Sequence, residues 1–438
     1  MTMKITATGD AILIQGFPEG GYEGFDEIRS FIARGDARIG NLETTVTDWD
    51  TYASTYCGGT WISTKPRILD QYLSLGLNFL GFANNHTMDM GPDGMLETLR
   101  NLEKRNVTYA GAGKDLASAS APAYRTFQSG RVAFLAISAT FDDAARAGYA
   151  SRTTIGRPGL NPLRKTVTAM VSPEHFRALT EILDNTGLEG AALNGIRDGF
   201  SPKWPEGTLK IGKTQFARTE GREEKVSKCS HHDLERIRDA VKDAHLIADY
   251  VVVMLHDHAI KADKMWEPDD AAKEFAHFCI DEGVDAVIGT GTHQFKPIEF
   301  YRGKPIFYSL GNFCFQSNVL EHQPYDMLER FNFPEMTDVQ GLARRNSGWT
   351  VGLHTQFYNF RTVIPYLEYD KNRLVKAELK PVELGFEKSR TFKGIPYPAN
   401  ERQTKEIFER LKELSEPYGT ALFLRDDGII EIKPDGTD

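Results

Sequence analysis

Short apolar runs alternate with helical patterns through the first half of the chain. Four of these runs predict buried strands, at residues 5–8, 37–42, 77–82 and 132–138. A helix is predicted from Gly91 to about Asn106, because Pro92 suits the first helical turn. Alternating strands and helices are typical of a layered α/β fold, which is the fold class that we predict.

The same alternation returns in the second half of the chain and then gives way to antiparallel strands. Strands are predicted at residues 250–255, 286–289, 305–309, 363–369 and 374–379. A helix is expected near residues 269–282. A further helix from about residue 401 to 415, and a hairpin that turns at Asp427-Gly428, are expected to form a small C-terminal appendage.

Residues 141–230 interrupt this pattern with a stretch rich in threonine, arginine, lysine and glycine. We interpret the stretch as an insertion in a main domain of residues 1–385, which the appendage at residues 386–438 follows. The basic side chains of the insertion could form a lid that receives carboxylates or phosphates. They are Arg152, Arg157, Arg164, Lys165, Lys203, Lys210 and Lys213. Nearby glutamates dilute this charge, so a solvated charged loop is the alternative interpretation.

Composition changes this picture little, but it removes several classes of function. The 438 residues carry a formal net charge of −9, with 40% hydrophobic and 26% charged residues, as in ordinary globular proteins. The chain has no basic footprint for nucleic acid, and its four cysteines are too far apart for a CxxC zinc site. The N-terminus lacks the apolar stretch of a signal peptide, and no run is long enough for a membrane span, so we predict a cytoplasmic protein.

Polar side chains of the kinds that bind metals recur where an apolar run stops. They are Asp10, Glu43, Asn85, His86, His256, His258 and His293. Because strand ends of an α/β sheet meet at one rim, these side chains can converge although they are distant in sequence. Carboxylates, an amide oxygen and imidazoles are the ligands of divalent metals such as Mn, Zn or Fe. Two such ions sharing a carboxylate would lower the pKa of a bridging water, which predicts a hydrolytic site.

The acidic residues and His293 also have structural interpretations when each is taken alone. Asp10 and Glu43 could cap helices or accept hydrogen bonds from loop amides. His293 alone could be a hydrogen-bonded surface histidine. The recurrence of such residues at successive strand ends favours a metal site over these separate interpretations.

The roles of two further residues depend on the local geometry of the chain. On an extended strand, His258 would point away from His256, so the two can share a metal only if the strand has already turned. Asp89 lies three residues after His86 and could either orient that imidazole or brace the loop.

The motifs at these strand ends resemble those of the CapA family of poly-γ-glutamate capsule proteins, a branch of the calcineurin-like metallophosphoesterase superfamily. The matching segments are Thr8-Gly9-Asp10, Gly40-Asn41-Leu42-Glu43, and residues 83–91, 289–293 and 303–313. They follow one another in order over roughly the first 315 residues. The combination is far more specific than any one segment.

This resemblance implies a four-layer α/β/β/α sandwich with one or two divalent ions at one edge. It implies that one metal is bound by Asp10, that Glu43 bridges the two metals, and that Asn85, His256 and His293 bind the other. It also implies that His86 is the general acid, which protonates a leaving group or stabilises an oxyanion.

The chain departs from the family pattern at two positions. Phe295 stands where superfamily members often have a further metal-binding histidine. The sequence His256-Asp257-His258 replaces the family's usual His-Trp-Gly. His258 could compensate for the missing imidazole if the strand bends at its end.

We therefore predict a metal-dependent hydrolase in which a metal-bound hydroxide attacks and His86 is the general acid. The bond is an amide, such as a γ-glutamyl linkage, or a phosphate ester, because similar metal ligands support attack on either centre. The substrate is expected to be an anionic small molecule or polymer. The alternative function is a non-catalytic binding or assembly subunit in poly-γ-glutamate or related polymer metabolism, which the loss of an imidazole at Phe295 favours.

Overall fold

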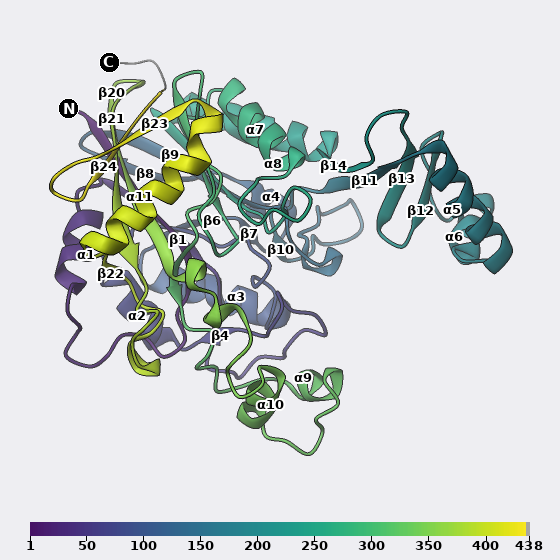
Figure 1. The fold of residues 1–438 in the computed structure, drawn as a ribbon, viewed down its shortest axis with the longest axis horizontal. Coiled ribbons are helices and arrows are strands. Elements are labelled where there is room, and N and C mark those ends of the chain that lie inside the picture. Colours follow the sequence, from purple (N-terminus) through teal and green to yellow (C-terminus); the bar gives the residue numbers. More distant parts are fainter. Residues whose placement is uncertain (435–438) are drawn as a thin grey trace.

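Two large β-sheets organise the protein, a computed structural model that describes residues 1–434 (Figure 1). The larger sheet has ten strands. Eight of them run in the order β23 (Thr420–Leu424), β24 (Ile430–Pro434), β21 (Arg373–Glu383), β20 (Arg361–Asp370), β1 (Met3–Ile12), β2 (Ala37–Leu42), β5 (Phe79–Gly81) and β6 (Thr108–Ala110). In addition, β19 (Asn312–Phe315) pairs with β1, and β22 (Tyr397–Pro398) pairs with β21.

The smaller sheet has six strands and faces the larger one across a common core. Its order is β17 (Ile298–Tyr301), β18 (Lys304–Phe307), β16 (Ala286–Thr290), β15 (Tyr250–His256), β9 (Gly130–Ser138) and β8 (Ala123–Phe127). Alternate side chains of each strand point to this core. Phe79 of β5, for example, packs against Phe134 of β9 with ring centroids 5.7 Å apart.

Helices cover the outer faces of both sheets (Figure 1). The outer face of the larger sheet packs against α1 (Phe25–Ile32), α2 (Pro66–Leu73) and α3 (Gly91–Lys104). The outer face of the smaller sheet packs against α7 (His231–Ile247) and α8 (Asp270–Asp281). Burying alternate faces of one strand in different cores explains why the strands are continuously apolar.

The last three strands, β22, β23 and β24, join the larger sheet. Strand β24 pairs with β21, and α11 (Glu401–Ser415) places Ile407, Leu411 and Leu414 in the core between the sheets. The predicted domain boundary near residue 385 stays a prediction. Within residues 1–434, none of the helices combines the length and apolar character that crossing a membrane requires.

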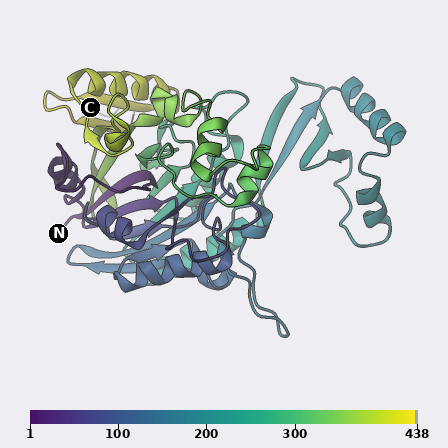
Figure 2. The same ribbon diagram turned by 90° about the horizontal axis from the view of Figure 1, so that it is seen from below.

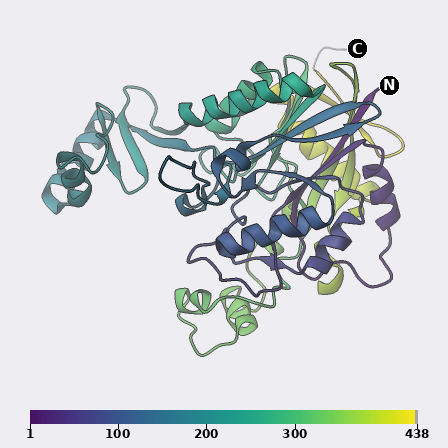
Figure 3. The same cartoon turned by 180° about the vertical axis from the view of Figure 1, so that it is seen from behind.

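The predicted insertion contains a separate four-stranded sheet that extends away from the two large sheets (Figures 1 and 2). Its order is β12 (Thr208–Ile211), β13 (Thr214–Arg218), β11 (Lys165–Val171) and β14 (Glu224–Cys229). Two helices accompany it, α5 (Pro173–Thr186) and α6 (Gly190–Arg197). A second projection carries α9 (Tyr325–Arg330) and α10 (Asp338–Arg345), which lie at a different corner of the molecule (Figure 3).

Short elements complete the chain between these layers. They are β3 (Thr45–Val46), β4 (Ser63–Thr64), β7 (Ala112–Gly113), α4 (Leu116–Ser120) and β10 (Gly159–Leu160). The α/β class, the helix predicted from Gly91 and the main predicted strands are confirmed. The strand predicted at residues 77–82 is shorter, because only Phe79–Gly81 has strand pairing.

Candidate metal centre

The ends of parallel strands bring most of the predicted residues together. Strands β1 and β2 are parallel neighbours, as are β15 and β16. Asp10 lies near the end of β1, and His256 is the last residue of β15. Glu43 follows β2, and His293 follows β16. Because the two sheets share a core, these strand ends converge at one edge of the molecule.

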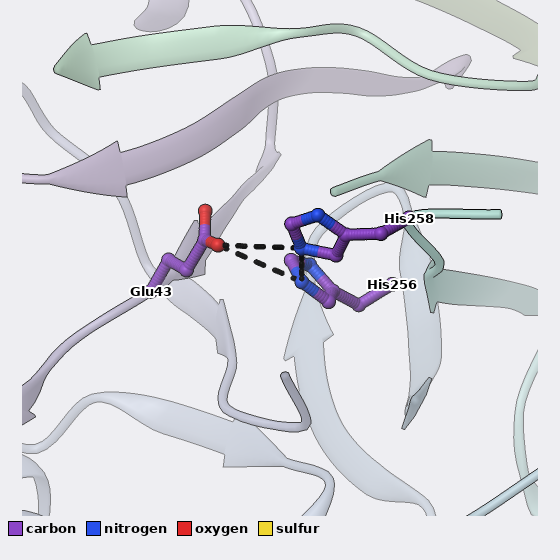
Figure 4. A group of neighbouring side chains, drawn as sticks. All are labelled: Glu43, His256 and His258. Carbon is purple, nitrogen blue, oxygen red and sulfur yellow. Dashed lines mark hydrogen bonds and ion pairs between the residues drawn. The ribbon is translucent and has the colours of Figure 1, made fainter. Parts of the chain in front are cut away.

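Glu43 faces two imidazoles in this cluster (Figure 4). Its Oε1 atom lies 3.6 Å from His256 Nε2 and 3.8 Å from His258 Nε2. The side chain is fully buried, and neither carboxylate oxygen has a hydrogen-bond partner among the described residues. Burial, and then the negative charge of Asp10, raise the pKa of Glu43 well above its ordinary value. A buried carboxylate without a donor is costly, and a bound cation would satisfy it.

Asn85 completes the group formed by Glu43, His256 and His258. Its Oδ1 atom lies 2.7 Å from His256 Nε2 and 3.3 Å from His258 Nε2, and the two Nε2 atoms are 3.0 Å apart. The Asn85 amide nitrogen donates to the Gly58 carbonyl at 2.7 Å, which turns the amide oxygen towards the imidazoles. Burial and the neighbouring imidazoles lower the pKa of His258 well below its ordinary value. Neutral imidazole nitrogens are the form that binds metal.

His258 lies in the same cluster as His256, because the chain turns after strand β15. Strand β15 ends at His256, and the turned chain brings both imidazoles to the same cluster. The His258 backbone N–H donates to Thr140 Oγ1 at 2.9 Å. Between the two histidines, the Asp257 carboxylate accepts hydrogen bonds from Lys165 Nζ at 2.7 and 2.8 Å. His256 and His258 therefore do not point in opposite directions, as they would if the extended strand continued through both residues.

Asp10 is held by backbone and side-chain donors around it. Its carboxylate accepts hydrogen bonds from Asn41 Nδ2 at 2.7 Å and from the Gly291 N–H at 2.9 Å. Burial by itself would raise the pKa of Asp10, but the neighbouring His256 and His293 hold it below its ordinary value. Asp10 is thereby kept in the charged form that a cation binds.

His293 groups with Asp10 and Glu43, and the ligand atoms of these three residues all lie within 4.8 Å of one another. His293 Nδ1 is 2.9 Å from Asn312 Oδ1, so its other ring nitrogen is left for the cluster. His256 lies close to this second group as well, because its Nδ1 atom is 3.6 Å from Asp10 Oδ1. The assignment implied by the family resemblance, in which His293 shares an ion with His256, stays a prediction.

His86 and Asp89 form a hydrogen-bonded pair beside the two groups. The distance from His86 Nδ1 to Asp89 Oδ2 is 2.7 Å, and both side chains are buried. Asp89 also accepts from the backbone N–H groups of Gly58 and Ile62, at 2.9 and 2.8 Å. Burial raises the pKa of Asp89, and the contact with His86 opposes this effect. Asp89 therefore makes hydrogen bonds both to the loop and to His86.

The structure adds residues that sequence reasoning did not single out. Asn41 supports Asp10, and Asn312 supports His293. Both lie inside the family-like segments, so their position in those motifs was the available signal. Phe295 is buried in the core between the sheets and is not one of the ligand-bearing residues.

These donors fit divalent metal ions. Two groups of carboxylate and imidazole atoms share one residue, Glu43, and Asn85 adds an amide oxygen to the first group. Oxygen and imidazole nitrogen are the ligands that Mn, Zn and Fe accept. The shared carboxylate is also the one that has no hydrogen-bond partner among the described residues. The site therefore has the ligand chemistry for a metal centre.

Comparison with known proteins identifies relatives along the chain. A family model described as "Bacterial capsule synthesis protein PGA_cap" matches residues 4–317. A Sinorhizobium fredii protein described as "Uncharacterized protein y4uA" is 30% identical over 440 residues, covering 98% of this chain and 93% of the relative. The "PGA biosynthesis protein CapA" of Bacillus subtilis is 25% identical over 292 residues, covering 66% of this chain and 56% of that protein. A "Probable polyglutamine synthesis accessory protein" of Mycobacterium tuberculosis is 53% identical over 45 residues, covering 10% of this chain and 11% of that protein.

Proposed function

The chain belongs to the PGA_cap family of bacterial capsule synthesis proteins, and on this premise we propose that it is a metal-dependent hydrolase. We interpret its facing sheets and outer helices as the four-layer α/β/β/α sandwich of the metallophosphoesterase superfamily. The bond that it cleaves is an amide of the γ-glutamyl type or a phosphate ester. The names of relatives, which refer to PGA and polyglutamine synthesis, favour the amide.

The observation that carries this proposal is the environment of Glu43. A structural role would require donors for its buried carboxylate, as the Asp10 and Asp89 carboxylates have. The Glu43 carboxylate instead lies beside Asp10 and the imidazoles of His256 and His258, whose Nε2 atoms are 3.6 and 3.8 Å from Glu43 Oε1. Such an arrangement is stable when a cation lies between the carboxylate and the nitrogens.

Each group of residues would hold one ion, with Glu43 shared between the two. Asn85, His256 and His258 would bind one ion, and Asp10 and His293 the other. Bound divalent ions would lower the pKa of a coordinated water and polarise the bond under attack. The protein holds these residues at strand ends and buries most of them, which keeps competing water away.

His86 would transfer a proton in the reaction. Its Nδ1 contacts Asp89, so the imidazole has a fixed orientation and its Nε2 is left to exchange a proton with the substrate. His86 also lines a cavity beside the metal-binding residues. Asp89 is a positioning residue, because it acts on the substrate only through His86.

Metal analysis together with matched histidine variants tests this function. His256→Ala should lose bound metal, whereas His86→Ala should keep the metal and lose turnover by about 10²- to 10⁴-fold. His231→Ala, at an exposed histidine of α7, is the control and should behave as the unmodified protein. The assays compare γ-glutamyl-p-nitroanilide, p-nitrophenyl phosphate and bis(p-nitrophenyl) phosphate with added Mn or Zn. Purified protein that binds no divalent ion, and whose melting temperature ignores chelation, would contradict the proposal and favour a non-catalytic subunit.

A further inference from the structure

A small cavity opens directly beside His86 and His293. Its volume is about 120 Å³, and its walls come from the loop at residues 58–62, from the chain after β19 and from α10 with the residues that follow it. The cavity therefore joins the proposed metal centre to the projection that carries α9 and α10. None of the seven basic residues of the predicted lid lines it.

The cavity is lined by basic rather than acidic side chains. Among the described residues, no aspartate or glutamate lines the cavity, whereas Arg345 does. The remaining polar lining groups include Asn346, Thr60 and Ser317. A cavity with a guanidinium and hydroxyl and amide groups, but no acid, attracts a negatively charged ligand.

Arg345 is half-buried and has no carboxylate partner within residues 1–434. Its Nη1 donates to Thr60 Oγ1 at 2.8 Å, and its guanidinium carbon lies 5.6 Å from the centroid of the Phe331 ring. Burial lowers the pKa of Arg345, and the positive charge of nearby Arg330 acts in the same direction. An arginine held in this way, with further donors still free, has the geometry to bind a planar or tetrahedral oxyanion.

A second group in the cavity also has no partner. The Ser317 hydroxyl oxygen is buried and makes no hydrogen bond with the described residues. A buried hydroxyl normally finds a partner, and Ser317 is one of the residues that line the cavity. This observation does not depend on the charge of Arg345.

The contact between Arg345 and Thr60 connects the cavity wall to the proposed proton-transfer residue. Thr60 belongs to the loop whose Gly58 and Ile62 N–H groups donate to Asp89, and Asp89 contacts His86. Gly58 packs so closely that an added Cβ would lie 2.7 Å from the His86 ring. A ligand that contacts Arg345 would therefore lie next to His86 rather than at a remote surface.

We propose that Arg345 binds an anionic group of the substrate, a carboxylate or a phosphate, while the bond to be cleaved lies at His86 and the metal-binding residues. This inference rests on the proposed hydrolase function and adds a specificity determinant to it. A substrate with a negative charge a short distance from the cleaved bond could place that charge at Arg345 and the bond beside His86. A γ-glutamyl amide has this arrangement, because three carbon atoms separate its free α-carboxylate from the γ-carbonyl.

Paired substrates that differ only in this charge test the proposal. γ-Glutamyl-p-nitroanilide is compared with its α-carboxamide analogue, using the full-length protein with Mn or Zn. Arg345→Gln should raise KM for the carboxylate substrate by about 10- to 100-fold, the effect of losing a charge-assisted hydrogen bond, and should leave the carboxamide unchanged. Arg345→Lys should recover part of the affinity that Arg345→Gln loses, because lysine keeps the positive charge but lacks the planar, two-pronged guanidinium. Arg344→Gln is the control, at an exposed neighbour on the same helix.

Direct binding separates this proposal from the proposed function. Titration calorimetry with glutarate and with inorganic phosphate, on the same variants, shows which oxyanion depends on Arg345. If no substrate is hydrolysed but binding of either anion weakens in Arg345→Gln and not in Arg344→Gln, the anion site stands and the hydrolase function fails. If hydrolysis occurs and Arg345→Gln changes neither KM nor binding, the anion site is wrong and the hydrolase function stands.

A purely structural role for Arg345 is distinguished by a third variant. Thr60→Val removes the hydrogen bond that joins α10 to the loop at residues 58–62 but keeps the guanidinium. If Arg345 binds the substrate, Thr60→Val should retain the preference for the carboxylate substrate over the carboxamide. If Thr60→Val loses that preference as Arg345→Gln does, Arg345 acts as a brace and the proposal is overturned.

Discussion

The strand-end cluster and the inserted sheet differ in how they arrange charged residues. In the cluster, Asp10, Glu43 and His256 are fully buried, and their side chains face one another. In the insertion, Lys203 and Lys213 are exposed, and Lys213 has only a 4.0 Å contact with Asp143. Exposed charges at this distance contribute little energy, because solvent screens them. Charged residue types therefore indicate a site only where the fold buries them together.

Two basic residues at the base of the insertion are exceptions to this contrast. Arg164 donates hydrogen bonds from Nε and Nη2 to the two carboxylate oxygens of Asp233. Burial would raise the pKa of Asp233, but these donors outweigh burial and hold the pKa below its ordinary value. Lys165, the next residue, donates to Asp257 between the two metal-facing histidines. The insertion is thus joined to the cluster at its base, while its outer part extends away from the two large sheets (Figure 1).

Removing the shared carboxylate should give the largest effect. Glu43→Gln should lose bound metal and most of the activity. The loss of activity should exceed the ~10- to 100-fold loss that is typical when a residue that only orients a metal ligand is removed. The chelated variant should melt above the chelated unmodified protein, because an unpaired buried carboxylate has been replaced by a neutral amide. Metal analysis, activity assays and thermal melting with and without chelator measure these changes.

The matched control for this change lies in the loop between β13 and β14 of the inserted sheet. Glu220→Gln removes an exposed glutamate and should keep metal, activity and melting temperature. Equal effects of Glu43→Gln and Glu220→Gln would remove the distinction between the two regions.

Breaking the contact at the base of the insertion should have an intermediate effect. Lys165→Met leaves the Asp257 carboxylate without its main cation, and loss of one partner of a buried pair costs about 3 kcal/mol of unfolding free energy. Metal affinity should also fall, since Asp257 lies between His256 and His258. Chemical denaturation and metal titration measure the two effects. Lys213→Met is the exposed control, and a Lys165→Met protein as stable as that control would show that the contact contributes nothing.

Neutralising the outer lysines of the insertion should have the smallest effect. The triple variant Lys203→Gln, Lys210→Gln and Lys213→Gln should keep kcat/KM for an anionic substrate within about twofold, because screened surface charges act weakly. The assay is repeated at low and high salt. A tenfold loss that disappears at high salt would restore the charged lid that the sequence suggested.

The local pattern of the sequence was sufficient for the strands and for the list of residues at their ends. Apolar runs predicted β1, β2, β15 and β16, and the members of both groups lie at the ends of these strands or just beyond them. Local periodicity carries this information because a buried strand must be apolar on both faces in a two-sheet core. The same reasoning did not separate the residues into groups, because spacing along the chain does not measure distance between strand ends.

The sequence by itself determined the α/β class, the family, and Asp10, Glu43, Asn85, His256 and His293 as candidate ligands. Only the tertiary structure decided that His258 turns back to join His256, that His293 lies with Asp10, and that Arg345 lines the cavity beside His86. The reason is physical. Which residues follow a strand is a property of local sequence, whereas which strand ends meet, and which distant helix closes the space beside them, depends on how the sheets pack.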